Sequence, residues 1–224
     1  MRLPSRARTL KGVLSLAEWI VLTVVDEGPT HGFAIAALTA EDGAVGRAWH
    51  VPRPIVYRSL DRLGALDLVR VQSSEAGHRG PRRSILTSTP AGAQAVGEWL
   101  ERPVGHVRDM RSELLVKLAL RLRRDLPAGP LVAAQRETVT RVRAAIERQR
   151  DAETGFGRIL LTWRYENAAA AERFLAAISK DGEDGEDGED GEDAVSTGES
   201  NDQGLGEGQH QAQAEGRDPV SEAP

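Results

Sequence analysis

Residues 52–88 read PRPIVYRSLDRLGALDLVRVQSSEAGHRGPRRSILTS, and this stretch decides the fold. Its first part predicts a helix that starts at one of the two prolines and ends near Leu66, because proline is tolerated in the first turn of a helix. Val56, Leu60 and Leu63 recur at helical spacing and form the side that we expect to face a core. The opposite side carries arginines, so the helix is predicted to be amphipathic with a basic outer face.

The second part of the stretch predicts a β-hairpin. Residues 68–73 (LVRVQS) alternate as a strand does, and residues 82–88 supply a second short strand. The connecting loop, residues 74–81, is rich in glycine and carries His78 and Arg79. We therefore expect a hairpin with a basic tip.

Two further helices are predicted before this stretch and one after it. Residues 14–27 are apolar on nearly all sides, which indicates a buried helix. The next helix is expected over residues 31–41, with Thr30 as its cap. After the hairpin, a helix is expected over residues 91–100, because a Thr-Pro pair precedes it. The apolar positions of the second helix are Phe33, Ile35, Ala36 and Leu38.

Three helices followed by a hairpin predict a winged helix-turn-helix, which makes the fold class mostly α with a small β-hairpin wing. In that fold the third helix presents its outer face to the major groove of DNA. The hairpin can then reach an adjacent phosphate or the minor groove. We expect this domain to span residues 12–102 and to follow a basic arm, residues 1–11.

Residues 108–179 are predicted to form a second, helical region. Its helices are expected over residues 111–124, 131–153 and 159–178. They are rich in charged side chains, so we expect them to bury their apolar faces by pairing with a second copy of the chain. The apolar positions, helix by helix, are Leu114, Leu115, Leu118 and Leu122; Val132, Val139, Val142 and Ile146; and Leu160, Trp163, Ala170 and Phe174.

Charge divides the chain into two parts. Residues 1–179 hold 27 basic and 19 acidic residues, whereas residues 180–224 hold two basic and 15 acidic ones. A basic body indicates an anionic partner such as nucleic acid. Residues 180–224 contain the repeat DGEDGEDGEDGED and almost no large apolar residue, so a disordered acidic tail is expected. Two roles stay open for it: a solvated appendage, or a competitor with DNA for the basic surface.

The composition excludes several classes of protein. Without cysteine there is no disulfide framework, no thiolate metal site and no cysteine nucleophile. No apolar run reaches the roughly 18 residues of a membrane span, so no membrane partner is expected. No signal-peptide pattern follows the basic N-terminus, and a cytoplasmic location is expected. The five histidines lack metal-ligand spacing, and no nucleophile-elbow or phosphate-loop motif occurs, so we expect neither an enzyme nor a bound cofactor.

Candidate DNA contacts come first from the third helix. Arg53, Arg58 and Arg62 lie on its outer side, where arginine can donate two hydrogen bonds to guanine O6 and N7. The alternative is a solvated basic face, and Arg62 can instead pair with an acidic residue inside the domain. Pro54 lies on the same side. Tyr57 lies on the flank, where it can donate to a phosphate or seal the helix against the core.

Two further groups complete the candidate interface. Thr30 and His31 lie at the N-terminus of the second helix, where backbone N–H groups can bind a phosphate. A structural cap or a packing role is the alternative for His31. The hairpin can contact phosphate through basic side chains, and a mobile, solvated wing is the competing interpretation. These hairpin candidates are His78, Arg79, Arg82 and Arg83.

The order and spacing of several motifs are similar to those of a known family. Residues 26–33 read DEGPTHGF, residues 55–63 read IVYRSLDRL, and GPRR at 80–83 is followed by TPAG at 89–92. The helical part from ELLVKL onward, residues 113–175, completes the set. Together they resemble the PadR-type winged-helix transcriptional regulators, whose patterns include E-G-P-x-H-G-[YF] and T-[IL]-Y-x-x-L-x-R-L.

The resemblance implies a homodimeric regulator of transcription that binds double-stranded DNA sequence-specifically, more often as a repressor. It also implies a small apolar or aromatic effector near the dimer interface, whose binding releases the DNA. Tyr57 matches a family tyrosine that contacts phosphate. Asp67 stands where the family often has glycine, and aspartate tolerates the left-handed backbone conformation better than most residues. The rival hypothesis is a protein-interaction adaptor that uses the same winged helix without binding specific DNA.

Overall fold

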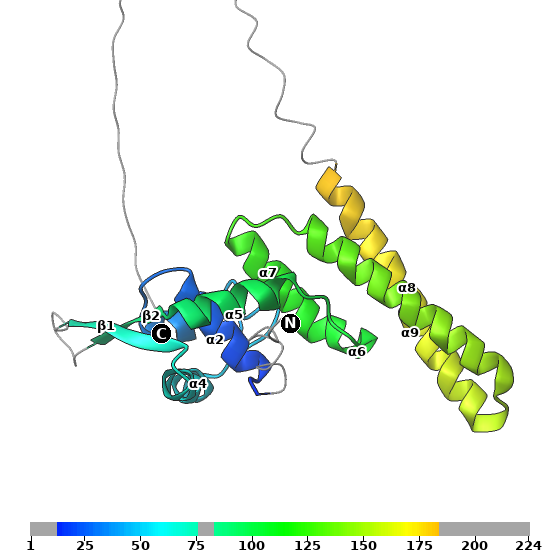
Figure 1. Cartoon of the computed structure of the whole chain (residues 1–224), viewed down its shortest axis with the longest axis horizontal. Coiled ribbons are helices and arrows are strands. Elements are labelled where there is room, and N and C mark those ends of the chain that lie inside the picture. The colour runs from blue at the N-terminus through cyan, green and yellow to red at the C-terminus, as the bar shows by residue number, and fades with distance from the viewer. Residues whose placement is uncertain (1–12, 76–82, 184–224) are drawn as a thin grey trace, which may run out of the picture. The chain divides into compact units, whose positions relative to one another are not determined.

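The computed structural model describes residues 13–75 and 83–183 of the 224-residue chain. The described part is mostly helical with one antiparallel hairpin, so the predicted fold class is confirmed. The predicted basic arm, the hairpin tip and nearly all of the acidic tail lie outside the described residues. In chain order the elements (Figure 1) are α2 (Leu16–Asp26), α3 (Gly32–Leu38), α4 (Arg53–Ala65), β1 (Val69–Glu75), β2 (Arg83–Ser88), α5 (Pro90–Glu101), α6 (Val107–Asp109), the π-helical turn η1 (Met110–Leu114), α7 (Leu115–Arg123), α8 (Gly129–Ala152) and α9 (Gly155–Glu183).

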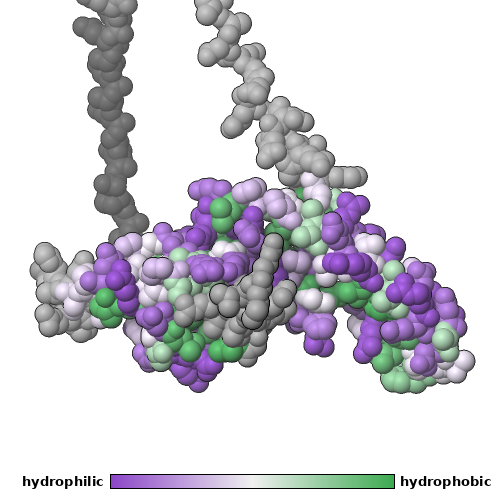
Figure 2. Space-filling view, viewed as in Figure 1, coloured by the Kyte–Doolittle hydropathy of each residue, from purple (hydrophilic) through white to green (hydrophobic). Residues whose placement is uncertain are grey.

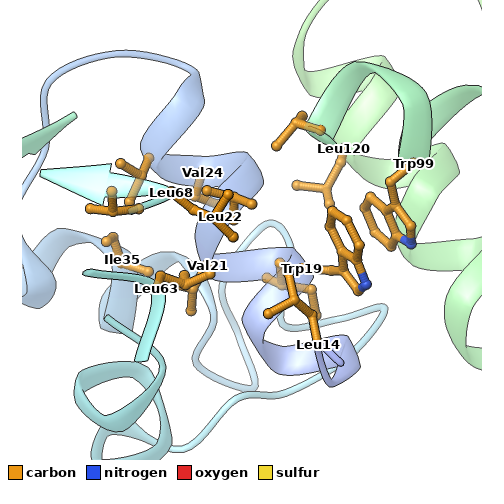
Figure 3. Close-up of a cluster of buried hydrophobic side chains, with 14 of the residues drawn as sticks. Leu14, Trp19, Val21, Leu22, Val24, Ile35, Leu63, Leu68, Trp99 and Leu120 are labelled. Atoms are coloured by element: carbon orange, nitrogen blue, oxygen red, sulfur yellow. The ribbon is translucent and has the colours of Figure 1, made fainter. Parts of the chain in front are cut away.

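Helix α2 is the centre of the first core, as its apolar sequence predicts. Its start is fixed by a capping box: the Glu18 N–H donates to Ser15 Oγ at 3.3 Å, and the Ser15 N–H donates to Glu18 Oε2 at 2.6 Å. From Trp19 to Val25 every side chain is buried. Figure 3 shows several of these side chains packed among Leu14, Ile35, Leu63, Leu68 and Leu120.

Helix α3 is shorter than predicted and ends at Leu38. Thr39 follows it, and its carbonyl accepts from the Val51 N–H at 3.0 Å, which ties the loop back to the helix end. A Cβ at Gly46 would collide with the Ala40 carbonyl oxygen, so only glycine allows this close approach. These contacts fix the loop between α3 and α4, and with it the position at which α4 starts.

Helix α4 buries the stripe predicted from the sequence. Val56, Leu60 and Leu63 all face the core. Just after the helix, Asp67 has a φ of 55°, the left-handed conformation expected there. The Thr89 hydroxyl donates to the Asp67 carbonyl at 2.8 Å, so the start of α5 holds this turn in place.

The hairpin pairs Val69 with Ser88 at its base, and a β-bulge interrupts the register between Val71 and Ser73. A third segment joins its edge. The Thr30 N–H donates to the Leu86 carbonyl at 3.0 Å, and the Leu86 N–H donates to the Thr30 carbonyl at 2.7 Å. The chain before α3 is thus hydrogen-bonded to β2, which fixes the hairpin relative to α3.

Helix α5 closes the first core. Thr89 caps it, as the Thr-Pro pair predicts, and the Gly92 N–H donates to the Thr89 hydroxyl at 3.1 Å. Trp99 stacks on Trp19 with a centroid separation of 5.2 Å and an interplanar angle of 2° (Figure 3). The two rings bring α5 against α2, and Leu120 of α7 packs into the same cluster.

Helices α8 and α9 lie side by side (Figure 1) and form a second core. Val132 and Val139 are buried in it, as predicted. The predicted anchors of α9, Leu160, Trp163, Ala170 and Phe174, are all exposed in the protomer, and their burial against a second copy stays a prediction. The helix carries apolar residues on two faces, and periodicity does not tell which face meets α8. The face that does is lined by Leu161, Ala168, Ala171 and Leu175.

Helix α7 also departs from the predicted pattern. Leu122 is exposed, whereas Lys117 is fully buried. The Lys117 ammonium lies 2.7 Å from Glu113 Oε1, donates to the Arg102 carbonyl at 2.8 Å, and lies 4.9 Å from the centroid of the Trp99 ring. Removing an ammonium group from water costs free energy, and proteins bury a lysine only when it is paired and hydrogen-bonded, as Lys117 is here.

None of the helices in the described ranges is long and apolar enough to cross a membrane.

Candidate nucleic-acid interface

The outer face of α4 is basic and open to solvent. Arg53, Tyr57, Arg58 and Arg62 are exposed, as is Pro54, while the apolar stripe points to the core. Asp61 is the one acidic residue in the sequence of this helix. The predicted outer face is therefore present, with a net positive charge.

Arg62 is the member of this face that is tied back into the domain. Its Nε lies 3.1 Å from Glu18 Oε1, and its Nη2 donates to the Val13 carbonyl at 2.8 Å. Glu18 is also the N3 residue of the capping box of α2, in which Ser15 is the N-cap. Arg62 thus has an acidic partner inside the domain in this structure, which is the alternative that the sequence left open. A role for Arg62 in binding DNA stays a prediction.

Arg58 differs from Arg62 in this respect. It is exposed at the middle of α4, and it makes no ion pair with a residue that the structure describes. Asp61 lies three positions along the same helix, and no ion pair joins it to Arg58 among the ion pairs of the described residues. A long, charged side chain without a fixed partner is available to a phosphate or a base edge.

The guanidinium of Arg53 lies near two aromatic rings. Its guanidinium carbon lies 5.5 Å from the centroid of Phe33 and 5.8 Å from that of Tyr57, within the range of cation–π attraction. Tyr57 is 41% exposed and its ring packs on Gly32. A Cβ at Gly32 would lie 2.8 Å from Tyr57 Cε1, so glycine at this position lets the ring take its place. The first turn of α4 is thereby joined to α3.

Thr30 and His31 lie beside this cluster. His31, not Thr30, is the N-cap of α3: its Nδ1 accepts from the Ala34 N–H at 3.0 Å. Both backbone hydrogen-bonding groups of Thr30 are used in the bridge to Leu86. The predicted cap at Thr30 is therefore wrong, because the backbone of Thr30 is drawn into the hairpin. Phosphate binding by Thr30 or His31 stays a prediction.

Of the four hairpin candidates, only Arg83 lies in a described element. His78, Arg79 and Arg82 lie outside the described residues. Arg83 is the first residue of β2, opposite Glu75 in the register. On the described part of the hairpin, Arg70 is exposed in β1. In the described ranges, no group of three or more histidine or acidic side chains could hold a metal ion.

Phe33 was missed as a residue of this interface. It was predicted to belong to the apolar side of its helix, yet it is 56% exposed. Ile35 is fully buried, and two positions along a helix correspond to about 200° of rotation, so the two side chains point to opposite sides. The angular positions of Phe33 and Ile35 around the helix, at about 100° per residue, therefore predict that only one of the two side chains is buried.

The described elements define the class of the fold as a winged helix-turn-helix. No protein-family model matches the sequence, and no curated protein matches it. Among solved structures the chain is similar to Bacillus subtilis PadR in complex with operator DNA, at 17% identity and a TM-score of 0.39, over 75% of this chain and 99% of that chain. What this chain binds is therefore inferred from its own residues.

Proposed function

We propose that this protein binds double-stranded DNA sequence-specifically and regulates transcription as a homodimer. The observation that carries the proposal is the exposed face of α4, where Arg58 has no ion-pair partner among the described residues and Arg53 is held by two rings. A helix of this kind fits the major groove, and arginine recognises guanine by two hydrogen bonds. The hairpin beside α4 is suited to the adjacent backbone.

The homodimer is proposed from an apolar stripe on α9. Phe156, Ile159, Leu160 and Trp163 recur at helical spacing and are exposed, Phe156 by 76% and Trp163 by 67%. Figure 2 shows apolar side chains gathered at the α8–α9 turn. A stripe of large apolar side chains on a solvent-exposed surface marks an interaction site. Two copies of the stripe can cover each other about a two-fold axis and so present two α4 helices to a palindromic site.

Repression and response to a small apolar or aromatic effector are the finer parts of the proposal. A hollow of about 1020 Å³ lies between the α7–α8 connection and the end of α9. Leu122, Val132 and Ile178 line it, and the first of these is an exposed leucine. Apolar walls of this kind suit a small apolar ligand. We expect small aromatic compounds to lower duplex affinity, and Leu122→Glu to remove that response.

The test of DNA binding is a fluorescence-anisotropy titration of the full chain against duplexes from the region upstream of its own gene, at several salt concentrations. A DNA-binding protein that contacts several phosphates loses affinity steeply as salt rises, because counterions are released. Arg58→Ala should weaken the specific complex. Absence of duplex affinity above background would instead support the adaptor hypothesis.

A further inference from the structure

Packing inside this domain does not account for the position of the Phe33 side chain. Its ring is more than half exposed, and its neighbours are the guanidinium of Arg53, 5.5 Å from the ring centroid, and the His31 ring, 6.4 Å away between centroids. Arg53 in turn lies over Tyr57. An arginine side chain has many rotamers, and two rings that bind its planar face restrict those rotamers before any ligand arrives. Phe33 and Arg53 therefore form one preorganised, partly apolar contact surface.

This surface lies at a groove of about 670 Å³ between α3, α4 and the hairpin. Phe33, Arg53, Tyr57 and Val71 line the groove, and Val71 is also exposed. Asp61 and Arg70 line it as well, so charges of both signs lie beside the apolar side chains. A groove that combines apolar surface with hydrogen-bonding groups of both kinds suits the edge of a base, which carries donors, acceptors and, in thymine, a methyl group.

We propose that Phe33 is a specificity-determining residue that packs on the C5-methyl group of a pyrimidine in the major groove. This inference rests on the proposed function of α4 as a DNA-binding helix. The C5-methyl of thymine is the apolar feature of the major groove, and phenylalanine is one of the side chains that contact it. Arg53 is a positioning residue in this proposal, because the contact between its guanidinium and the Phe33 ring restricts both side chains. The ligand class is a C5-methylated pyrimidine, thymine or 5-methylcytosine.

The experiment compares duplexes that differ by single methyl groups. A specific duplex is first enriched from a random-sequence library with the full-length protein, and each thymine is then replaced by deoxyuridine, which removes only the C5-methyl. At one position in each half-site, the wild-type chain should lose about four-fold in affinity, the value of one buried methyl-sized group. Phe33→Ala should bind the thymine and uracil duplexes equally. Arg53→Lys should reduce the difference, because an ammonium lacks the planar face that holds the ring.

The control is Arg58→Ala, which should lower affinity for thymine and uracil duplexes by the same factor. Circular dichroism and thermal unfolding establish that Phe33→Ala is folded, as expected for an exposed ring. A wild-type chain that is indifferent to every thymine methyl overturns the proposal while leaving the proposed function intact. So does Phe33→Ala that keeps the full four-fold preference. Failure to enrich any specific duplex overturns both.

Discussion

Arg62 on α4 and Glu18 at the start of α2 form an ion pair, with Nε of the arginine 3.1 Å from Oε1 of the glutamate. The same carboxylate accepts a hydrogen bond from the Ser15 N–H in the capping box. One acidic side chain therefore both begins the central helix of the core and fixes the far end of the basic helix. This relationship separates Arg62 from Arg58, in line with the alternative that the sequence left open for Arg62, an acidic partner inside the domain.

The first prediction concerns the stability that Glu18 confers. Glu18→Ala removes half of the capping box and the partner of Arg62, and we expect it to lower the free energy of unfolding by about 1–2 kcal/mol. Arg62→Ala should cost less than about 1 kcal/mol, because the arginine side chain is 52% exposed and its ion pair is screened by water. Urea unfolding of both variants measures the difference. A larger loss for Arg62→Ala would contradict this assignment.

The second prediction separates the arginines of α4 in DNA binding. Arg58→Ala should weaken the specific complex by about 1–3 kcal/mol, the value of one good arginine–base contact. Arg62→Ala should weaken it less, since Arg62 is already engaged within the domain. Arg148→Ala removes the same charge from an exposed position on α8 and serves as the matched control. Equal losses for Arg58 and Arg148 would mean that only net charge matters.

The third prediction uses two glycines of one helix. A Cβ at Gly92 of α5 would collide with the Leu68 carbonyl oxygen, whereas a Cβ at Gly97 meets nothing within 4 Å. Gly97→Ala should raise the free energy of unfolding by about 0.5–1 kcal/mol, because glycine disfavours a helix interior. Gly92→Ala should lower it by about 1–3 kcal/mol, because α5 must move away from the hairpin base. Thermal or urea unfolding checks both signs.

The fourth prediction tests the α9 stripe. Trp163→Glu places a carboxylate in the middle of the proposed dimer contact, and we expect it to convert a dimer to a monomer in sedimentation or light-scattering measurements. The substitution leaves the protomer core intact, because Trp163 is exposed there. Trp49→Glu is the control, since it adds the same charge at another exposed tryptophan. A wild-type chain that is monomeric at all concentrations would remove the basis for this prediction.

The fifth prediction concerns the buried lysine of α7. Lys117→Ala removes the partner of Glu113 and the group that bonds the Arg102 carbonyl, and should cost about 3 kcal/mol or more. Lys117→Met combined with Glu113→Gln should cost less, because it fills the same volume and leaves no charge without a partner. Chemical denaturation of the two variants compares them. If the double variant is the less stable one, the pair contributes net stability.

Much of the fold followed from the sequence because its signals are local. The inward stripe of α4, the Thr-Pro start of α5 and the strands on either side of the hairpin all depend on side chains within a few residues of each other. The left-handed turn at Asp67 is local in the same sense. A turn that needs positive φ restricts the residue that occupies it, whatever lies around it.

Periodicity does not tell which of two apolar faces of a helix packs inside the protomer. On α9 the side that packs against α8 is lined by small residues such as Ala168 and Ala171, whereas the large residues around Trp163 stay outside. Small side chains let two helices approach closely, and that advantage exists only once the second helix is present. Lys117 is a similar case, because its partners on Arg102 and Trp99 come from outside its own helix.

The sequence by itself determined the order of elements, the basic outer face of α4 and the absence of cysteine chemistry, since each depends on residue type and short spacing. Only the tertiary structure decided which basic side chains are available. Arg62 is engaged by Glu18, 44 positions earlier in the chain, and Arg53 is held by Phe33 from another helix. Such pairings are set by how helices cross, and the spacing of residues along one helix carries no information about its neighbour.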